Sequence, residues 1–346
     1  MNSIWTMISA VGSFALAWGL GKFLVPFLRK LKYGQTILDI GPKWHKTKQG
    51  TPTMGGLIFI ISSIVVTGII LLVFNLIYLN ADLSSIEKGV TTYSLNTIRV
   101  VQGLFMAVGF GTIGFIDDYI KVVKKRNLGL TSLQKLVLQF LVAGGFLFSL
   151  YLTGGNSATI IPFVGTVDIG FMYWILSAIL IVGVVNAVNL SDGIDGLVGS
   201  MTFFCGLIFM LISTLLASFG TSIMAAAIAG SCLGFLMWNF FPAKVFMGDT
   251  GSLYLGGYIC ALAFCINMPI IIIPIGLVYL LEMLSVILQV CYFKITKGKR
   301  LFKMSPIHHH FEMCGWSEIK IVSVFSIVTV ITGIIALLCV TFGVLG

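Results

Sequence analysis

The sequence predicts an all-α, polytopic integral membrane protein with about ten transmembrane helices. Hydrophobic residues make up 58% of its 346 residues and charged residues only 10%, against roughly 25% charged residues in an ordinary soluble chain. The apolar residues form continuous runs, which favours helices over a membrane β-barrel. At roughly 20 residues per crossing, the chain can supply such a bundle, and we expect one transmembrane domain over residues 1–346.

Each predicted span is an apolar window bounded by polar residues, glycine or proline. The ten windows are residues 4–28, 54–79, 98–116, 133–152, 171–188, 197–218, 222–240, 250–267, 270–292 and 319–345. The first window has no basic residue before its apolar stretch, which indicates a retained span rather than a signal peptide. Pro269 and Pro274 near the start of the ninth window predict a bend there.

The basic residues sort to one side of these spans. With the N-terminus outside, all but two of the 21 basic residues, Lys88 and Arg99, fall in or beside the inner loops. The positive-inside rule then places both termini outside the cytoplasm and explains the net charge of +9 without any ligand. We expect no nucleic-acid partner, because no basic run is interleaved with aromatic residues in a soluble module.

Acidic residues at the inner ends of spans are more informative, because topology gives no reason to place them there. Asp117 and Asp118 follow the third window, and Lys121 and Lys125 come next. If the helix continues, Asp117, Lys121 and Lys125 share one face. The alternative is a solvated helix end with internal ion pairs.

A second acidic junction follows the fifth window. Asn186 and Asn189 lie one helical turn apart, and Asp192 and Asp195 occupy a glycine-broken turn. An EF-hand is excluded, because the twelfth position counted from Asp192 is Phe203 instead of a bidentate Glu. Helix capping would explain one aspartate but neither the second aspartate nor the asparagine pair.

The third junction, FMGDTGS at residues 246–252, comes directly before the eighth window. Asp249 or Thr250 could cap that helix, and a helix start with Gly, Thr and Ser also presents free N–H groups to a phosphate. No P-loop pattern is present. Oxygen ligands without Cys or His favour Mg²⁺ that shares its coordination with a substrate phosphate.

Three consecutive histidines, His308 to His310, form the fourth junction. Three adjacent residues cannot all face one metal from a helix, so zinc is a poor match. The histidines could bind phosphate oxygens or carry protons, or they could simply belong to a polar loop. Glu282 lies in the middle of the ninth window; because no partner can be named for it, we rank it below the aspartates, as a packing or polar-network residue.

Together these motifs resemble the polyprenyl-phosphate N-acetylhexosamine-1-phosphate transferase superfamily, and within it the phospho-N-acetylmuramoyl-pentapeptide transferase family. The resemblance covers essentially the whole chain. It is carried by KQGTPTMGG (48–56), Asp117-Asp118 with the following lysines, NAVNLSDGIDG (186–196), FMGDTGS (246–252) and PIHHHFEMCGW (306–316). Cys314 stands where we would expect Lys in the family.

The resemblance implies an enzyme of the bacterial inner (cytoplasmic) membrane with its active site on the cytoplasmic face. Such an enzyme transfers phospho-MurNAc-pentapeptide from UDP-MurNAc-pentapeptide to undecaprenyl phosphate, which gives lipid I and UMP for peptidoglycan biosynthesis, and it requires Mg²⁺. Residue identity does not separate direct attack from a covalent phospho-enzyme; we favour direct attack. It also leaves open whether the chain acts as a homodimer.

The resemblance also implies roles for individual residues. Asp249 would hold Mg²⁺, Asp117 would act as the base on the acceptor phosphate, and Asp118 would support the site. His309 is the catalytic candidate in the histidine motif, and Phe246 is a candidate to stack on uracil. The expected substrate contacts are Lys48, Lys121, Lys125, Lys135, Asn186, Asn189, Asp192, Asp195, Asn239, Phe246, His308 and His310.

Two other functions compete with this interpretation. A sister transferase that loads GlcNAc-1-phosphate from UDP-GlcNAc would share the aspartate junctions and Mg²⁺, but the segment from His308 to Glu312 argues against it. A transporter of lipid-linked anionic substrates would more often carry ionisable residues at mid-membrane and show repeat-related broken helices. Only Glu282 is placed in that way.

Overall fold

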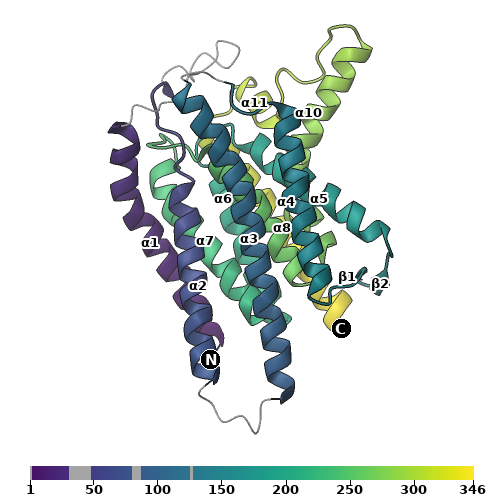
Figure 1. Cartoon of the computed structure of the whole chain (residues 1–346). Coiled ribbons are helices and arrows are strands. Elements are labelled where there is room, and N and C mark those ends of the chain that lie inside the picture. The colour runs from purple at the N-terminus through teal and green to yellow at the C-terminus, as the bar shows by residue number, and fades with distance from the viewer. Residues whose placement is uncertain (1, 31–47, 80–86, 125–127) are drawn as a thin grey trace.

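The computed structural model describes residues 2–30, 48–79, 87–124 and 128–346. Within them, nine helices are long and apolar enough to cross a membrane, and they run side by side as one bundle (Figure 1). The chain is therefore a mostly helical, multi-pass membrane protein. These nine helices are α1 (Asn2–Lys30), α2 (Leu57–Leu79), α3 (Glu87–Val123), α4 (Ser132–Leu152), α5 (Met172–Ser191), α6 (Leu197–Leu215), α7 (Phe219–Asn239), α10 (Leu277–Ile295) and α12 (Glu318–Val340).

The eighth predicted span is a helix, α8 (Gly248–Cys265), but it is not one of these nine. Its first turns contain Gly, Asp, Thr and Ser, which lower its hydropathy. Every residue from Thr250 to Cys265 is buried, and α8 packs against α3 and α5. Its neighbours can therefore accommodate the glycines and hydroxyl groups that lipid would disfavour.

The ninth predicted span is broken near its start, as its prolines predict. A single 3₁₀ turn, η3 (Pro269–Ile271), leads into the short helix α9 (Ile272–Ile275), and α10 begins after Gly276. Proline removes a backbone donor and interrupts the helical hydrogen bonds. The last turns of α10, in yellow-green, project beyond the other helices (Figure 1).

A short hairpin, which the all-α prediction missed, follows α4. Strands β1 (Ala158–Ile161) and β2 (Gly165–Asp168) pair antiparallel, with Ala158 opposite Asp168. β-branched residues favour the strands, and Gly165 closes the turn with φ +95°. The Ile160 N–H donates to the Asn267 carbonyl at 3.0 Å, which ties the hairpin to the end of α8.

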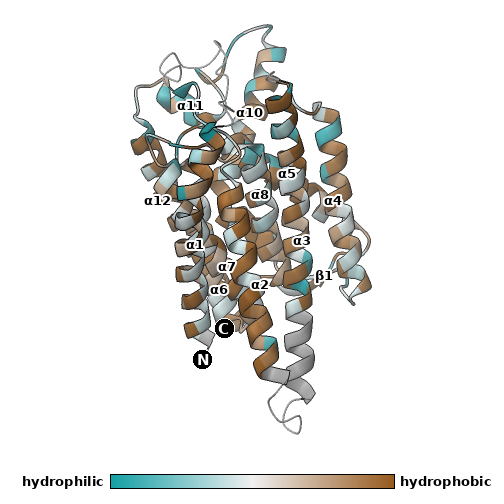
Figure 2. Cartoon of the chain, turned by 60° about the vertical axis from the view of Figure 1, so that its left-hand side comes forward, coloured by the Kyte–Doolittle hydropathy of each residue, from teal (hydrophilic) through white to brown (hydrophobic). Residues whose placement is uncertain are grey.

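The two ends of the bundle differ in polarity. The short helix α11 (Ile307–Glu312) lies at one end, which we call the site end, and the start of α1 and the C-terminus lie toward the other (Figure 1). Apolar residues cover the sides of the bundle, whereas hydrophilic residues gather around α11 and the nearby loops (Figure 2). Polar chemistry is therefore concentrated at the site end.

Candidate active site

Three carboxylates from two helices meet at the site end. Asp117 and Asp118 lie on α3, which continues past its predicted end to Val123, and Asp249 lies in the first turn of α8. One carboxylate oxygen from each lies within 4.8 Å of the others. Asp117 and Asp118 are buried and Asp249 is half-buried. We call these three residues the acidic cluster.

Two lysines neutralise part of the acidic cluster. Lys121 Nζ lies 2.6 Å from Asp117 Oδ2 and 3.2 Å from Asp249 Oδ2. Lys135 Nζ lies 3.1 Å from Asp117 Oδ2 and 2.5 Å from Asp249 Oδ2. Three carboxylates against two ammonium groups leave one uncompensated negative charge, which attracts a cation. Lys125, the third lysine predicted for this face, lies outside the described residues.

Local hydrogen bonds fix each member of the acidic cluster. Asp117 Oδ1 accepts from the Leu130 N–H at 2.7 Å, just before the capping box of Thr131 and Gln134 that begins α4 and places Lys135 in its first turns. Thr250 donates to Asp118 Oδ2 through its N–H at 2.9 Å and its hydroxyl at 2.7 Å.

Asn189 holds the third carboxylate from the end of α5. Its Nδ2 donates to Asp249 Oδ1 at 3.1 Å and to Ser252 Oγ at 2.8 Å. Neither Asp249 nor Thr250 caps α8: the N-cap residue is Met247, without a side-chain hydrogen bond. The capping alternative for this junction is therefore wrong, and both side chains act between helices.

The glycines of the 48–56 motif allow the chain to pass close beneath the start of α8. The Gly56 N–H donates to the Met247 carbonyl at 3.1 Å. A Cβ atom on Gly56 would lie 2.4 Å from Gly251 Cα, a distance that no side chain can occupy. The close approach of Gly56 to Gly251 therefore fixes the position of the first turn of α8 relative to the 48–56 motif, and with it the position of Asp249.

A second charged group, which we call the Lys48 bridge, consists of Lys48, Asp195 and Glu318. Lys48 Nζ lies 2.8 Å from Asp195 Oδ1 and 2.6 Å from Glu318 Oε2. The Asp195 N–H also donates to Glu318 Oε2, at 3.1 Å. Glu318 was not predicted as a site residue, although an acid at the inner end of the last span was the same signal that selected the aspartates.

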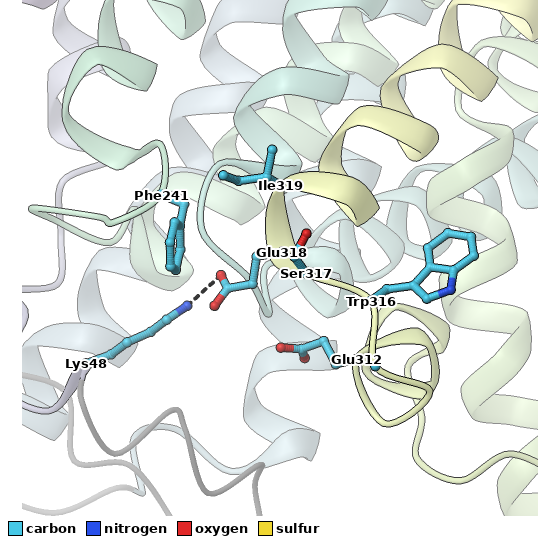
Figure 3. A pocket seen from close by; sticks show the side chains of 8 residues that line it. Lys48, Phe241, Glu312, Trp316, Ser317, Glu318 and Ile319 are labelled. Carbon is cyan, nitrogen blue, oxygen red and sulfur yellow. Dashed lines mark hydrogen bonds and ion pairs between the residues drawn. The ribbon is translucent and has the colours of Figure 1, made fainter.

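The Lys48 bridge borders a pocket of about 440 Å³. Lys48 and Glu318 point toward each other across it, with the ring of Phe241 above and Glu312 on the wall below (Figure 3). The remaining lining residues are Gly315, Trp316, Ser317 and Ile319. A volume in this range is usual for a small-molecule site.

Three of the predicted substrate-contact residues form hydrogen bonds that join the elements around the site. Asn186 Nδ2 donates to Gln139 Oε1 at 2.7 Å, which joins α5 to α4. Asn239 Oδ1 accepts from the Gly196 N–H at 3.1 Å, and its Nδ2 donates to the Val245 carbonyl. Phe246 is half-buried, and its carbonyl accepts from the Gly55 N–H at 2.8 Å.

The three histidines lie on α11 and have three different environments. His308 is wholly buried. His309 Nδ1 lies 2.6 Å from Glu312 Oε2, with 13% of the His309 side chain exposed. His310 Nδ1 accepts from the Lys303 N–H at 3.1 Å. The segment is thus an ordered helix and not a polar loop, and His308 has no exposed atoms with which to contact a substrate.

Glu282 has a partner that the sequence did not reveal. Its Oε2 lies 3.0 Å from His308 Nδ1, and both side chains are wholly buried. A partner in the interior is what an ionisable residue within a span requires.

Asp192, which ends α5, has a raised pKa. Burial raises the pKa of its carboxyl most, and repulsion from Asp249, Asp118 and Asp195 raises it further, to about 8. The negative field of the acidic cluster therefore extends to the turn at residues 191–196.

The acidic cluster fits Mg²⁺ by its donor set. Its ligand atoms are carboxylate oxygens, and no Cys or His belongs to this group among the residues that the structure describes. Mg²⁺ prefers such oxygen ligands and keeps several waters or substrate phosphates in its coordination sphere.

The fold and the site together define a polytopic membrane protein with an acidic cluster suited to a divalent cation, and the comparisons define its family. The family model for glycosyl transferase family 4 matches residues 100–267, and signature 1 of the phospho-N-acetylmuramoyl-pentapeptide transferases matches residues 48–60. These matches span the acidic cluster, the turn at residues 191–196 and the 48–56 motif.

Curated relatives define the family more narrowly. Phospho-N-acetylmuramoyl-pentapeptide-transferases of Clostridium perfringens strain SM101 and strain 13 are 45% and 46% identical over 331 residues, which is 95% of this chain and 95% and 97% of theirs. The Bacillus thuringiensis enzyme is 45% identical over 324 residues, 92% of this chain and 93% of its own. The chain belongs to the phospho-N-acetylmuramoyl-pentapeptide transferase family and is a transferase enzyme.

Proposed function

We propose that the chain transfers phospho-MurNAc-pentapeptide from UDP-MurNAc-pentapeptide to undecaprenyl phosphate, with Mg²⁺, and releases UMP. The observation that carries this proposal is the acidic cluster with its two lysines, placed at one end of a membrane-spanning bundle. The relatives' names support the donor. The bundle supports an acceptor whose hydrocarbon tail stays in the bilayer.

The proposed topology follows from charge. We assign the site end to the cytoplasmic face of the bacterial inner membrane, because nearly all basic residues are expected on that side. Added to the nine candidate spans, α8 then makes ten crossings of a single transmembrane domain over residues 1–346, and both termini lie outside the cytoplasm. In this orientation a soluble nucleotide donor and a membrane-bound phosphate can reach the same carboxylates.

In the proposed reaction, an oxygen of the acceptor phosphate attacks the β-phosphorus of the donor in line, and UMP leaves. Asp117, held by Lys121 and Lys135, takes up the acceptor proton where one is present. The lysines stabilise charge on the phosphate oxygens. Bound Mg²⁺, held by Asp249 with Asp117 and Asp118 nearby, would supply further charge stabilisation.

We assign the donor's nucleotide to the pocket beside the Lys48 bridge. The aromatic ring of Phe241 offers a stacking surface, and Lys48 offers a positive charge for a phosphate. His309 is half-buried and pairs with Glu312, which lines this pocket. We propose that His309 contacts the donor.

Purified protein with UDP-MurNAc-pentapeptide and undecaprenyl phosphate tests this function, with UMP as the readout and EDTA as the metal-free arm. Asp249→Asn should lower UMP release by about 10²-fold or more, whereas Asp168→Asn, the same change on the exposed hairpin, should not. Near-normal turnover of Asp249→Asn would remove it from the metal site. Equal turnover of UDP-GlcNAc by the parent protein would favour the sister transferase.

A further inference from the structure

Glu282 is a carboxylate in the interior of α10, a helix long and apolar enough to cross a membrane. Its side chain is wholly buried. A carboxylate in such surroundings is costly unless another group compensates it. The reaction proposed above does not use Glu282, so its place in the fold needs another explanation.

The compensation comes from one residue on another element. Glu282 Oε2 lies 3.0 Å from Nδ1 of His308 on α11 and 3.5 Å from the His308 backbone nitrogen. Within the described residues, Glu282 Oε1 and both ring nitrogens of His308 are buried without a hydrogen-bond partner. The 3.0 Å approach of Glu282 Oε2 to His308 Nδ1 is therefore an electrostatic contact, and the hydrogen bond comes from the His308 backbone N–H. Each side chain therefore depends on the other.

His308 also packs against the turn at residues 191–196, which we call the aspartate turn. A Cβ atom on Gly193 would lie 2.1 Å from His308 Nε2, so the ring lies directly on the backbone between Asp192 and Asp195. His308 therefore joins α10 to this turn. Its ring centroid is 4.1 Å from that of His309, so any movement of His308 moves its neighbour.

A second contact on α10 holds the same segment. Gln289, two turns after Glu282, accepts from the N–H groups of Leu301 and Phe302 at 3.1 and 2.8 Å. One face of α10 thus holds the stretch that leads into α11 at two points. Gln289 fixes its beginning, and Glu282 fixes the first turn of α11.

We propose that Glu282 is a positioning residue: by pairing with His308, it holds α11 against the aspartate turn and so sets the position of His309 toward the donor. This inference rests on the proposed function, because it assumes that α11 contacts UDP-MurNAc-pentapeptide. Glu282 touches no reacting atom. Its removal should change donor binding through His308, and it should leave the acceptor site unchanged.

The test uses the full-length protein in detergent, assayed for UMP release and corrected for the folded fraction. Glu282→Gln should raise the KM for UDP-MurNAc-pentapeptide about fivefold or more and leave the KM for undecaprenyl phosphate within about twofold. His308→Gln should do the same. The double variant should be no worse than the more damaging single variant, since both changes break one interaction.

Ser285→Ala is the matched control on the same helix, because within the described residues its hydroxyl bonds only the backbone carbonyl of Glu282, at 2.6 Å. Both KM values should stay within about twofold. An unchanged donor KM in Glu282→Gln, or losses that multiply in the double variant, would overturn the positioning role. If Glu282→Gln does not fold, Glu282→Asp, one methylene shorter, replaces it with the same criteria. A parent protein that releases no UMP would instead refute the proposed function.

Discussion

Lys48 is predicted to stabilise the folded protein by holding two buried carboxylates together. It bonds Asp195 and Glu318, whose side chains are only 2% and 8% exposed. Lys48→Met removes the cation and keeps the apolar stem. Breaking a buried ion pair by removing one partner costs about 3–5 kcal/mol; because 14% of the Lys48 side chain is exposed, we expect a loss near 3 kcal/mol, about a hundredfold in the unfolding equilibrium.

Equilibrium unfolding by SDS in mixed micelles, followed by tryptophan fluorescence, measures this loss. The informative comparison is between Lys48→Met alone and the double variant Lys48→Met, Glu318→Gln. Glutamine at position 318 can still accept from the Asp195 N–H, and its amide N–H can donate to the Asp195 carboxylate. The double variant should therefore be more stable than Lys48→Met alone. A double variant that is less stable than the single one would refute charge compensation as the role of Lys48.

Three further predictions concern the neighbourhood of the acidic cluster. Burial and nearby acids raise the pKa of Asp192 to about 8 in the folded protein. Between about pH 4 and pH 8 the folded state therefore holds one more proton at this site than the unfolded state, so the free energy of unfolding without Mg²⁺ should fall as pH rises through this range. Asp192→Asn should flatten this slope in the same unfolding assay. Gly56→Ala should cost about 1–3 kcal/mol or prevent folding, since its Cβ would lie 2.4 Å from Gly251 Cα, and wild-type stability would contradict that close approach. Asn189→Asp replaces a donor to Asp249 with a fourth carboxylate and should lower UMP release about tenfold at neutral pH; an unchanged rate would show that this hydrogen bond is dispensable.

The acidic cluster was the part of the site most open to prediction from sequence. Acids at the inner ends of spans have no topological explanation, so their grouping at one end was a strong expectation, and Asp117, Asp118 and Asp249 do meet. From sequence, the continuation of the helix past Asp117 was only one of two alternatives; α3 does continue, and the structure places Asp117 and Lys121 one turn apart on one face.

The contacts of the histidines and of Glu318 could not be derived in the same way. Three adjacent residues on a helix point in directions about 100° apart, so sequence cannot decide which of the three histidines turns inward. Glu318 meets Lys48 across 270 residues of chain, a pairing that only tertiary packing creates. The β1–β2 hairpin was missed because its strands have four residues each, too few for a clear alternating pattern.

The composition of α8 has a consequence for how the protein is made. A segment with Asp, Thr, Ser and several glycines in its first turns partitions poorly into lipid by itself. During synthesis α8 would leave the insertion machinery only together with a partner, and α3, α5 and α7 have already been made by then. In the proposed topology, membrane integration of α8 would then depend on its packing against α3 and α5, so a mutation that loosens α3 should lower the fraction of protein in which α8 is inserted.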